Sequence, residues 1–134
     1  MTEEFDIIII GGGAGGLTAA IYASRELHKT LLVEKQMTGG LASTTHLMEN
    51  YPGFPSGVGG AELIKLFRQQ AERFGTEIRE FVDVKSLEKL DDGRIAVHAT
   101  EHHFIAKAVI IATGSFPRKI GVPGEKEFYG EFLM

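Results

Sequence analysis

The chain has 134 residues, of which 43% are hydrophobic and 24% are charged, and its formal net charge is −4 at pH 7. This size and composition suit one globular domain with a buried core. The acidic balance and the scattered Lys and Arg residues argue against a nucleic-acid surface or a polybasic membrane patch. The sequence contains no cysteine, which excludes a disulfide framework, a zinc-thiolate site and a thiol redox centre within these residues.

The amino terminus does not have the pattern of a signal peptide or a membrane anchor. Residues 1–4 are acidic overall, and the apolar run that follows them is too short to span a bilayer. A signal peptide would begin with positive charge before its apolar stretch. We therefore expect a cytoplasmic protein.

The first predicted unit, over residues 5–34, is a strand, a glycine-rich turn, a helix and a second strand. The apolar run Phe5 to Ile10 leads directly into a turn that fits G-x-G-x-x-G at Gly11, Gly13 and Gly16. Apolar residues then recur at helical spacing, at Leu17, Ala19, Ala20, Ile21 and Ala23. A second apolar run, Thr30 to Val33, ends at Glu34. This order predicts a site for the pyrophosphate and ribose of a dinucleotide.

Each part of this motif has a physical role. Gly11 permits a tight turn, Gly13 lets a ligand approach the main chain, and Gly16 lets the helix pack on the sheet. Amides in the first helical turn lack partners within the helix and favour an anion. Glu34 would accept hydrogen bonds from a ribose and would repel a 2′-phosphate. The alternative is a structural glycine turn, and the motif alone does not choose between NAD and FAD.

Residues 36–60 form a long connection rich in Gly, Pro, Ser and Thr, which is typical of a functional or disordered loop. An amphipathic helix is predicted from Gly60 to its end at Gly75, with apolar positions at Leu63, Leu66, Phe67, Ala71 and Phe74. Its other face carries Lys65, Arg68, Gln69 and Glu72, which we interpret as a solvated surface.

Shorter strands are predicted after this helix, at Glu77–Phe81, Val82–Leu87, Arg94–Thr100 and His103–Ala106. The turn at Asp91, Asp92 and Gly93 indicates a hairpin, and the alternation of Ile95, Val97 and Ala99 indicates an antiparallel sheet with one wet face. Ala108–Ala112 is continuously apolar, as expected for a central parallel strand. Residues 117–134 resemble a linker.

Several segments together resemble the N-terminal FAD-binding part of the thioredoxin reductase family, the class II pyridine nucleotide-disulfide oxidoreductase-like flavoproteins. The resemblance covers nearly the whole chain. Its most specific block is Glu49-Asn50-Tyr51-Pro52-Gly53-Phe54-Pro55, which lies between the paired glycines at Gly39 and Gly40 and the block Ala108-Val109-Ile110-Ile111-Ala112-Thr113-Gly114. Other matching segments are Asp6–Gly13, Ser43–Thr45, Gln70–Gly75 and Pro117–Lys119.

The resemblance implies FAD as the cofactor and assigns residues to it by position. Gly11, Gly13, Ala14, Gly15 and Gly16 would hold the pyrophosphate, and Glu34 and Lys35 would flank the adenosine ribose. Gly39, Gly40 and Leu41 would lie along the flavin with Thr45 and Asn50. Val84 would contact adenine through its backbone, and Ala112, Thr113 and Gly114 would close over the cofactor. Relatives usually have Gln at the position of Leu41, so this contact survives only if it uses the backbone.

The family's FAD domain is made of two segments separated by an NADPH-binding domain, which in thioredoxin reductase carries a Cys-x-x-Cys pair. This sequence ends at Met134 without a second glycine motif or a cysteine pair. We therefore expect residues 1–116 to form the first segment of an FAD-binding domain and residues 117–134 to lead toward the NADPH domain.

No residue is nominated as a catalytic acid, base or nucleophile, because in flavin enzymes the isoalloxazine ring carries the electron chemistry. The histidines at 28, 46, 98, 102 and 103 do not have the spacing of a metal site, and we interpret them as surface residues. For His46, in the predicted cofactor loop, the alternative is an approach to the flavin.

We thus expect an α/β fold of the FAD/NAD(P)-binding, Rossmann-like type, with three layers, a parallel central sheet and a small antiparallel β-meander. The first hypothesis is that the chain is the FAD-binding part of an oxidoreductase that passes electrons from NAD(P)H through FAD to a disulfide. The second is a non-catalytic flavin- or nucleotide-binding module that works by self-association, as a homodimer, or with a partner chain. A third hypothesis is an NAD-binding Rossmann domain. Nucleic acid and membrane are not expected as partners.

Overall fold

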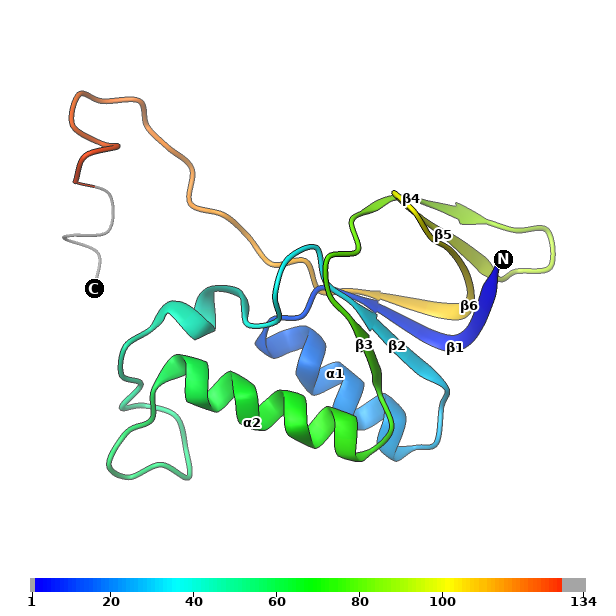
Figure 1. Ribbon diagram of the computed structural model, residues 1–134, viewed down its shortest axis with the longest axis horizontal. Helices are drawn as coiled ribbons and strands as arrows, with labels where there is room; N and C mark the ends of the chain where they lie inside the picture. Colours follow the sequence, from blue (N-terminus) through cyan, green and yellow to red (C-terminus); the bar gives the residue numbers. More distant parts are fainter. Residues whose placement is uncertain (1, 129–134) are drawn as a thin grey trace.

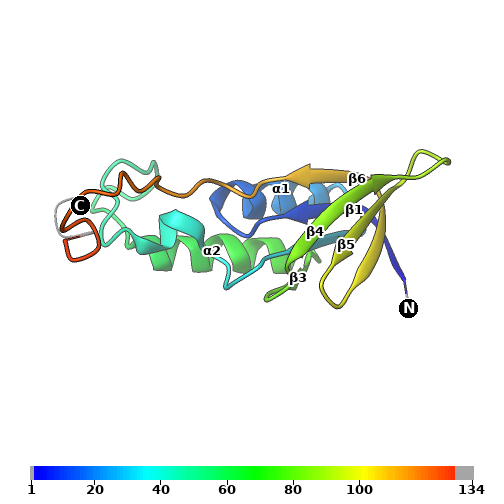
Figure 2. The ribbon, with the colours of Figure 1, turned by 90° about the horizontal axis from the view of Figure 1, so that it is seen from above.

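The computed structural model describes residues 2–128 and is built on one six-stranded sheet with the order β3-β2-β1-β6-β5-β4. Two helices lie side by side against the parallel half of this sheet, and the antiparallel strands curl away at the other end (Figures 1 and 2). The helices are α1 (Ala14–Arg25) and α2 (Gly60–Arg73), and the strands are β1 (Glu3–Ile10), β2 (Thr30–Val33), β3 (Glu77–Arg79), β4 (Val84–Lys89), β5 (Ile95–Ala99) and β6 (His103–Ile111).

The predicted unit of residues 5–34 is confirmed as β1, α1 and β2. β1 is parallel to β2 on one side and to β6 on the other, and β2 is parallel to β3. The first strand begins at Glu3, before the apolar run, because its polar start still pairs with β6. Parallel pairing brings the carboxyl ends of β1, β2 and β6 to one edge of the sheet.

Two apolar clusters lie on opposite faces of the sheet. The cluster under the helices joins Ile9 and Leu32 of the sheet to Leu17 and Ala20 of α1 and Ile64 of α2. The cluster on the other face contains residues of β1, β2, β5 and β6 and one residue of the segment between β3 and β4, namely Phe5, Ile8, Leu31, Val33, Val82, Val97, Ala99, Phe104 and Ala106. The alternation of Ile8 and Ile9 between the clusters follows from the two-residue period of a strand.

The antiparallel meander of β4, β5 and β6 covers this second face. The predicted hairpin is confirmed, since β4 pairs with β5 in antiparallel fashion and Gly93 donates its amide to the Leu90 carbonyl oxygen across 3.0 Å. The bounds of two predicted strands were wrong. β3 ends at Arg79, and Phe81 has a left-handed backbone with φ 62°, which a strand does not accommodate, so β4 begins at Val84.

The prediction of two separate strands at 103–106 and 108–112 was also wrong, because they form the single strand β6. Its first half pairs with both β1 and β5, whereas the register with β5 ends at Ala106. Among the described residues, the second half therefore has one neighbouring strand, β1. The side chain of Ile111 is 67% exposed and that of Ile110 is 38% exposed. This apolar run is parallel to β1, as predicted, but it is not buried on both faces.

The predicted second helix is confirmed as α2, whose C-cap is Phe74 and which is followed by Gly75 with φ 94°. The connection before it contains a 3₁₀ helix, η1 (Gly40–Thr44), and an isolated bridge between Met48 and Val58. In the described part of the chain, no helix is long and apolar enough to cross a membrane.

After β6 the chain leaves the sheet as an extended segment and turns at 123–128 (Figure 1). This course suits the predicted linker, but the boundary at residue 116 stays a prediction. Residues 129–134 of that linker lie outside the described residues.

Candidate nucleotide-binding site

Two positions of the glycine turn between β1 and α1 are packed against main-chain carbonyl oxygens too tightly to admit a side chain. Gly11 has φ 111°, and a Cβ atom added to it would lie 2.2 Å from the carbonyl oxygen of Ala112. A Cβ atom at Gly16 would lie 1.8 Å from the carbonyl oxygen of Gly11. The turn thus depends on glycine at its start and at its third motif position, as the sequence predicts.

The middle of the turn is open. A Cβ atom at Gly13, the N-cap of α1, would meet its nearest neighbour, the Cα of Gly40, at 3.9 Å, and one at Gly15 would have nothing within 4 Å. Ala14, Gly15 and Gly16 supply the first amides of α1, which in a helix lack internal acceptors. The open space at Gly13 and Gly15 leaves this helix start approachable by an anion.

Glu34 lies directly against the turn. Its carboxylate accepts the Gly12 amide at 2.7 Å through Oε2 and the Gln36 amide at 2.9 Å through Oε1. The sequence places Glu34 at the end of β2 but does not reveal this bond to Gly12, the one turn glycine for which no role is predicted. The carboxylate therefore holds the turn, and its predicted contact with a ribose stays a prediction.

The loop after β2 forms a second wall of the turn. Gly39 donates its amide to the Gly12 carbonyl oxygen across 2.9 Å. A Cβ atom at Gly40 would lie 3.2 Å from the Cα of Gly13, so Gly40 and Gly13 face each other closely. Gly39 and Gly40, which were predicted for the cofactor, are thus brought to the same place as the glycine turn.

The end of β6 lies on a third side of the glycine turn. Ala112 donates its amide to the Ile10 carbonyl oxygen across 2.8 Å and lies against Gly11. Thr113 and Gly114 follow it and are exposed. The carboxyl ends of β1, β2 and β6 therefore meet at one point, which is where open α/β sheets bind their ligands.

The structure leaves other predicted site residues at the margin of this place. Lys35 forms an ion pair with Asp83, with Nζ 3.4 Å from Oδ2, and Val82 donates its amide to the Glu34 carbonyl oxygen, so the segment leading to Val84 lies beside Glu34. Leu41 is 56% exposed in η1, and Thr45 follows η1. Asn50 is exposed in a loop whose Tyr51 packs against Phe67 of α2.

A polar cluster that sequence reasoning missed joins this loop to α2. Glu80 Oε1 accepts bonds from the Thr38 amide at 2.7 Å, the Thr38 hydroxyl at 2.9 Å and Arg68 Nη1 at 2.7 Å. The interpretation of Arg68 as part of a solvated face was wrong, because its guanidinium is half-buried against Thr38 and Glu80. The helical period predicts only that Arg68 lies opposite the core. The sequence carries no signal for its partners Thr38 and Glu80, because both lie outside α2.

Electrostatics around Glu80 favour its charged form. Burial alone would raise the pKa of Glu80, but the hydrogen bonds from Thr38 and the charge of Arg68 hold that pKa below its ordinary value of 4.5. The pKa of Arg68 is raised, chiefly by its hydrogen bond to Glu72. The cluster is therefore ionised throughout the neutral range.

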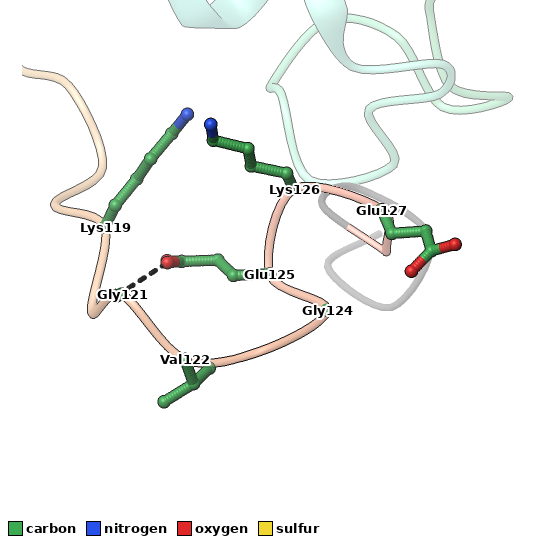
Figure 3. Close-up of a pocket in the computed structure, with 7 residues that line it drawn as sticks. All are labelled: Lys119, Gly121, Val122, Gly124, Glu125, Lys126 and Glu127. Carbon is green, nitrogen blue, oxygen red and sulfur yellow. Dashed lines mark hydrogen bonds between the residues drawn. The ribbon is translucent and has the colours of Figure 1, made fainter.

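Two other features lie away from the turn. His98 Nδ1 is 3.1 Å from His103 Nδ1, and within residues 2–128 no group of three or more candidate side chains could hold a metal. The tail at 119–127 forms a hollow of about 330 Å³, which the side chains of Lys119 and Lys126 help to line and in which Glu125 accepts the amides of Ile120 and Gly121 (Figure 3). This hollow is made by the tail itself and is not the predicted cofactor site.

Known proteins resemble the chain over nearly all of its length. A 137-residue alignment with the thioredoxin reductase of Bacillus subtilis (strain 168) is 43% identical and spans 97% of this chain and 41% of the relative. The thioredoxin reductase of Treponema pallidum (strain Nichols) is 39% identical over 132 residues, 97% of this chain and 42% of the relative. The chain thus spans about two fifths of the length of these curated relatives.

The fold matches solved structures as well. The crystal structure of T. acidophilum thioredoxin reductase superposes with a TM-score of 0.86 at 39% identity, covering 96% of this chain and 41% of that chain. Residues 5–133 match the family described as pyridine nucleotide-disulphide oxidoreductase. With the glycine turn, Glu34 and the end of β6 in the geometry above, the chain belongs to the pyridine nucleotide-disulphide oxidoreductase family and corresponds to an N-terminal segment of the thioredoxin reductase kind.

Proposed function

We propose that this chain is the FAD-binding part of a flavin-dependent oxidoreductase of the thioredoxin reductase kind. The observation that carries the proposal is the convergence of three features on one point: the open amides at the start of α1, the Glu34 carboxylate and the end of β6. An anion suits the helix start, and a hydroxylated sugar suits the carboxylate. Both groups occur together in the adenosine diphosphate half of FAD.

The residues present fit this half of the cofactor. The space around Gly13 and Gly15 admits close approach of a diphosphate to the main chain. Glu34 uses one acceptor position on each oxygen for the amides of Gly12 and Gln36, and a carboxylate oxygen can accept a second bond. It can therefore hold the turn and accept ribose hydroxyls at the same time.

The protein's own part in the reaction is binding and orientation. Bound flavin supplies the electron chemistry, while the amides of Ala14, Gly15 and Gly16 would hold the diphosphate and Glu34 the ribose. By the same assignment, Gly39, Gly40 and Ala112 would bound the site, and Lys35, Leu41, Thr45, Asn50, Val84, Thr113 and Gly114 would contact the cofactor around it. Residues 1–116 would be the first segment of the FAD-binding domain and residues 117–134 its link to the NADPH domain.

FAD titration of two glycine variants tests this site. Gly13→Ala adds a methyl group where the proposed diphosphate lies, and the fold has room for it. Gly59→Ala is the matched control, because Gly59 is the N-cap of α2 and its added Cβ would make an ordinary 3.5 Å contact with the His46 carbonyl oxygen. We expect Gly13→Ala to weaken FAD binding at least tenfold and Gly59→Ala to leave it within twofold. Equal affinities for both variants would refute the assignment, and a colourless chain that binds NAD would favour a nicotinamide cofactor.

The route of the electrons is a further part of the proposal. In the thioredoxin reductase scheme, electrons pass from NAD(P)H through FAD to a disulfide, and the 134 residues contain no cysteine. We therefore expect this chain by itself to show no NADPH-dependent disulfide reduction. Robust turnover by the purified chain would contradict this division of roles.

A second candidate function is a non-catalytic flavin- or nucleotide-binding module that works through a second chain or a second copy. The observation that favours it is the second half of β6, which within residues 2–128 pairs with β1 but with no strand on its other edge, and which exposes Ile110 and Ile111. An exposed strand edge with apolar side chains is a surface for pairing. Measurement of mass in solution tests it, since a monomer that remains soluble at high concentration counts against self-association.

A further inference from the structure

We propose that Glu80 and Arg68 are positioning residues that hold the Thr38–Gly40 wall of the cofactor site in place. This inference rests on the function proposed above, and it concerns residues outside the set that the family resemblance assigns to the cofactor. The cluster joins three elements: the loop after β2, the segment after β3, and α2.

The first step is the fixation of Thr38. Both its amide and its hydroxyl donate to Glu80 Oε1, and Arg68 Nη1 lies 3.0 Å from the same hydroxyl oxygen. The Glu80 side chain is 19% exposed, so these bonds are shielded from water more than a surface ion pair would be. Hydrogen bonds to a charged group in such a place are stronger than those between neutral groups.

The second step runs from Thr38 to the glycine turn. The methyl group of Thr38 lies 2.8 Å from where a Cβ atom at Gly12 would stand, so Thr38 packs directly on that glycine. The next residue, Gly39, bonds to the Gly12 carbonyl oxygen, and Gly40 faces Gly13. Movement of Thr38 would therefore displace the wall that faces the start of α1.

Glu72 provides a matched control on the same arginine. It accepts a bond from Arg68 Nε across 2.9 Å, one helical turn away, but it is exposed and does not contact the loop. A role limited to stabilising α2 would make Glu72 and Glu80 similar in effect. A positioning role makes Glu80 alone important for the cofactor.

The experiment compares Glu80→Gln with Glu72→Gln by FAD titration and by amide hydrogen exchange of the chain without cofactor. We expect Glu80→Gln to weaken FAD binding about tenfold and to speed exchange of the Thr38 and Gly39 amides about tenfold, with α1 amides unchanged. Glu72→Gln should change each quantity less than twofold. If Glu80→Gln does not fold, Thr38→Val replaces it, with an expected loss in FAD affinity of about threefold.

The outcomes separate the two proposals. Wild-type protein that binds no FAD, while its Thr38 and Gly39 amides are protected through Glu80, refutes the proposed function but upholds the positioning of the loop. FAD binding that is unchanged in Glu80→Gln, or exchange that rises equally in α1 and the loop, overturns the positioning role.

Discussion

The two helices of this chain begin alike but present very different amino-terminal ends. Each has glycine as its N-cap, Gly13 for α1 and Gly59 for α2. At α2 the next residue is enclosed, since the Gly60 amide donates to the Thr45 carbonyl oxygen and a Cβ atom there would lie 1.9 Å from the Ala42 carbonyl oxygen. At α1 the corresponding space is open. A helix start becomes a ligand site only where the fold leaves it uncovered.

The two helix starts also differ in the charge of their first turns. The first turn of α2 contains Glu62, which complements the positive end of the helix dipole, whereas the first turn of α1 consists of small and apolar residues. The first turn of α2 thus carries its own carboxylate, whereas that of α1 carries none and is the place where we propose that the diphosphate binds.

The largest expected effect is a loss of unfolding free energy when a methyl group is added to the tightly packed glycine near the start of either helix. Gly16→Ala and Gly60→Ala each place a methyl group within 2 Å of a carbonyl oxygen, and overpacking of this kind costs about 3 kcal/mol of unfolding free energy. Gly15→Ala, which meets nothing within 4 Å, should instead be neutral or stabilising by up to about 1 kcal/mol. Urea unfolding of the three variants measures this. A Gly60→Ala protein as stable as wild type would show that η1 does not enclose α2 as described.

A carboxylate introduced into the first turn of α1 should abolish the difference in charge between the two helix starts. Gly15→Glu places negative charge in the first turn of α1, where it favours the helix but repels a diphosphate. We expect at least a tenfold loss of FAD affinity without loss of unfolding free energy. Glu62→Gln in α2 is the counterpart and should cost about 0.5 kcal/mol of stability while leaving FAD binding unchanged. Unchanged binding in Gly15→Glu would exclude the start of α1 as the diphosphate site.

The smallest effect concerns pH and the loop that faces α1. The pKa of Glu80 lies below 4.5 in the folded protein, since the bonds from Thr38 and the charge of Arg68 outweigh the effect of burial. A lowered carboxyl pKa contributes stability above the unfolded value, and this contribution is lost as the pH falls from about 4.5 through the folded value. The unfolding free energy of wild type should therefore decline more steeply below pH 4.5 than that of Glu80→Gln, measured by urea unfolding at several pH values. Parallel declines would show that Glu80 carries no such linkage.

Sequence reasoning succeeded where a feature depends on neighbouring residues. The β1–α1–β2 unit, the helix ending before Gly75 and the hairpin at Gly93 all follow from local period and turn chemistry, and the structure confirms each. It was wrong in dividing β6 into two strands, because the continuity of β6 comes from pairing with β1 on both sides of Lys107, from Phe104 to Ile111, and not from the local apolar pattern. It also misplaced Arg68, whose partner Glu80 lies on another element.

The cytoplasmic location, the domain boundary at residue 116 and the individual cofactor contacts stay predictions. Of these, the contacts are the most open to test, because the structure shows which of the predicted residues lie together. Gly11, Gly13, Gly16, Glu34, Gly39, Gly40 and Ala112 meet at one edge of the sheet, while Leu41 and Asn50 are exposed in the connection.

The amino-acid order alone determined the α/β class, the glycine turn and the acidic residue at the end of the second strand, because strand and helix periods and steric limits on glycine act over a few residues. The tertiary structure decided which helix start is open, where β6 loses its second neighbour, and that Glu80 and Arg68 meet at Thr38. These features depend on the distance between segments far apart in the chain, which packing sets and local pattern does not encode.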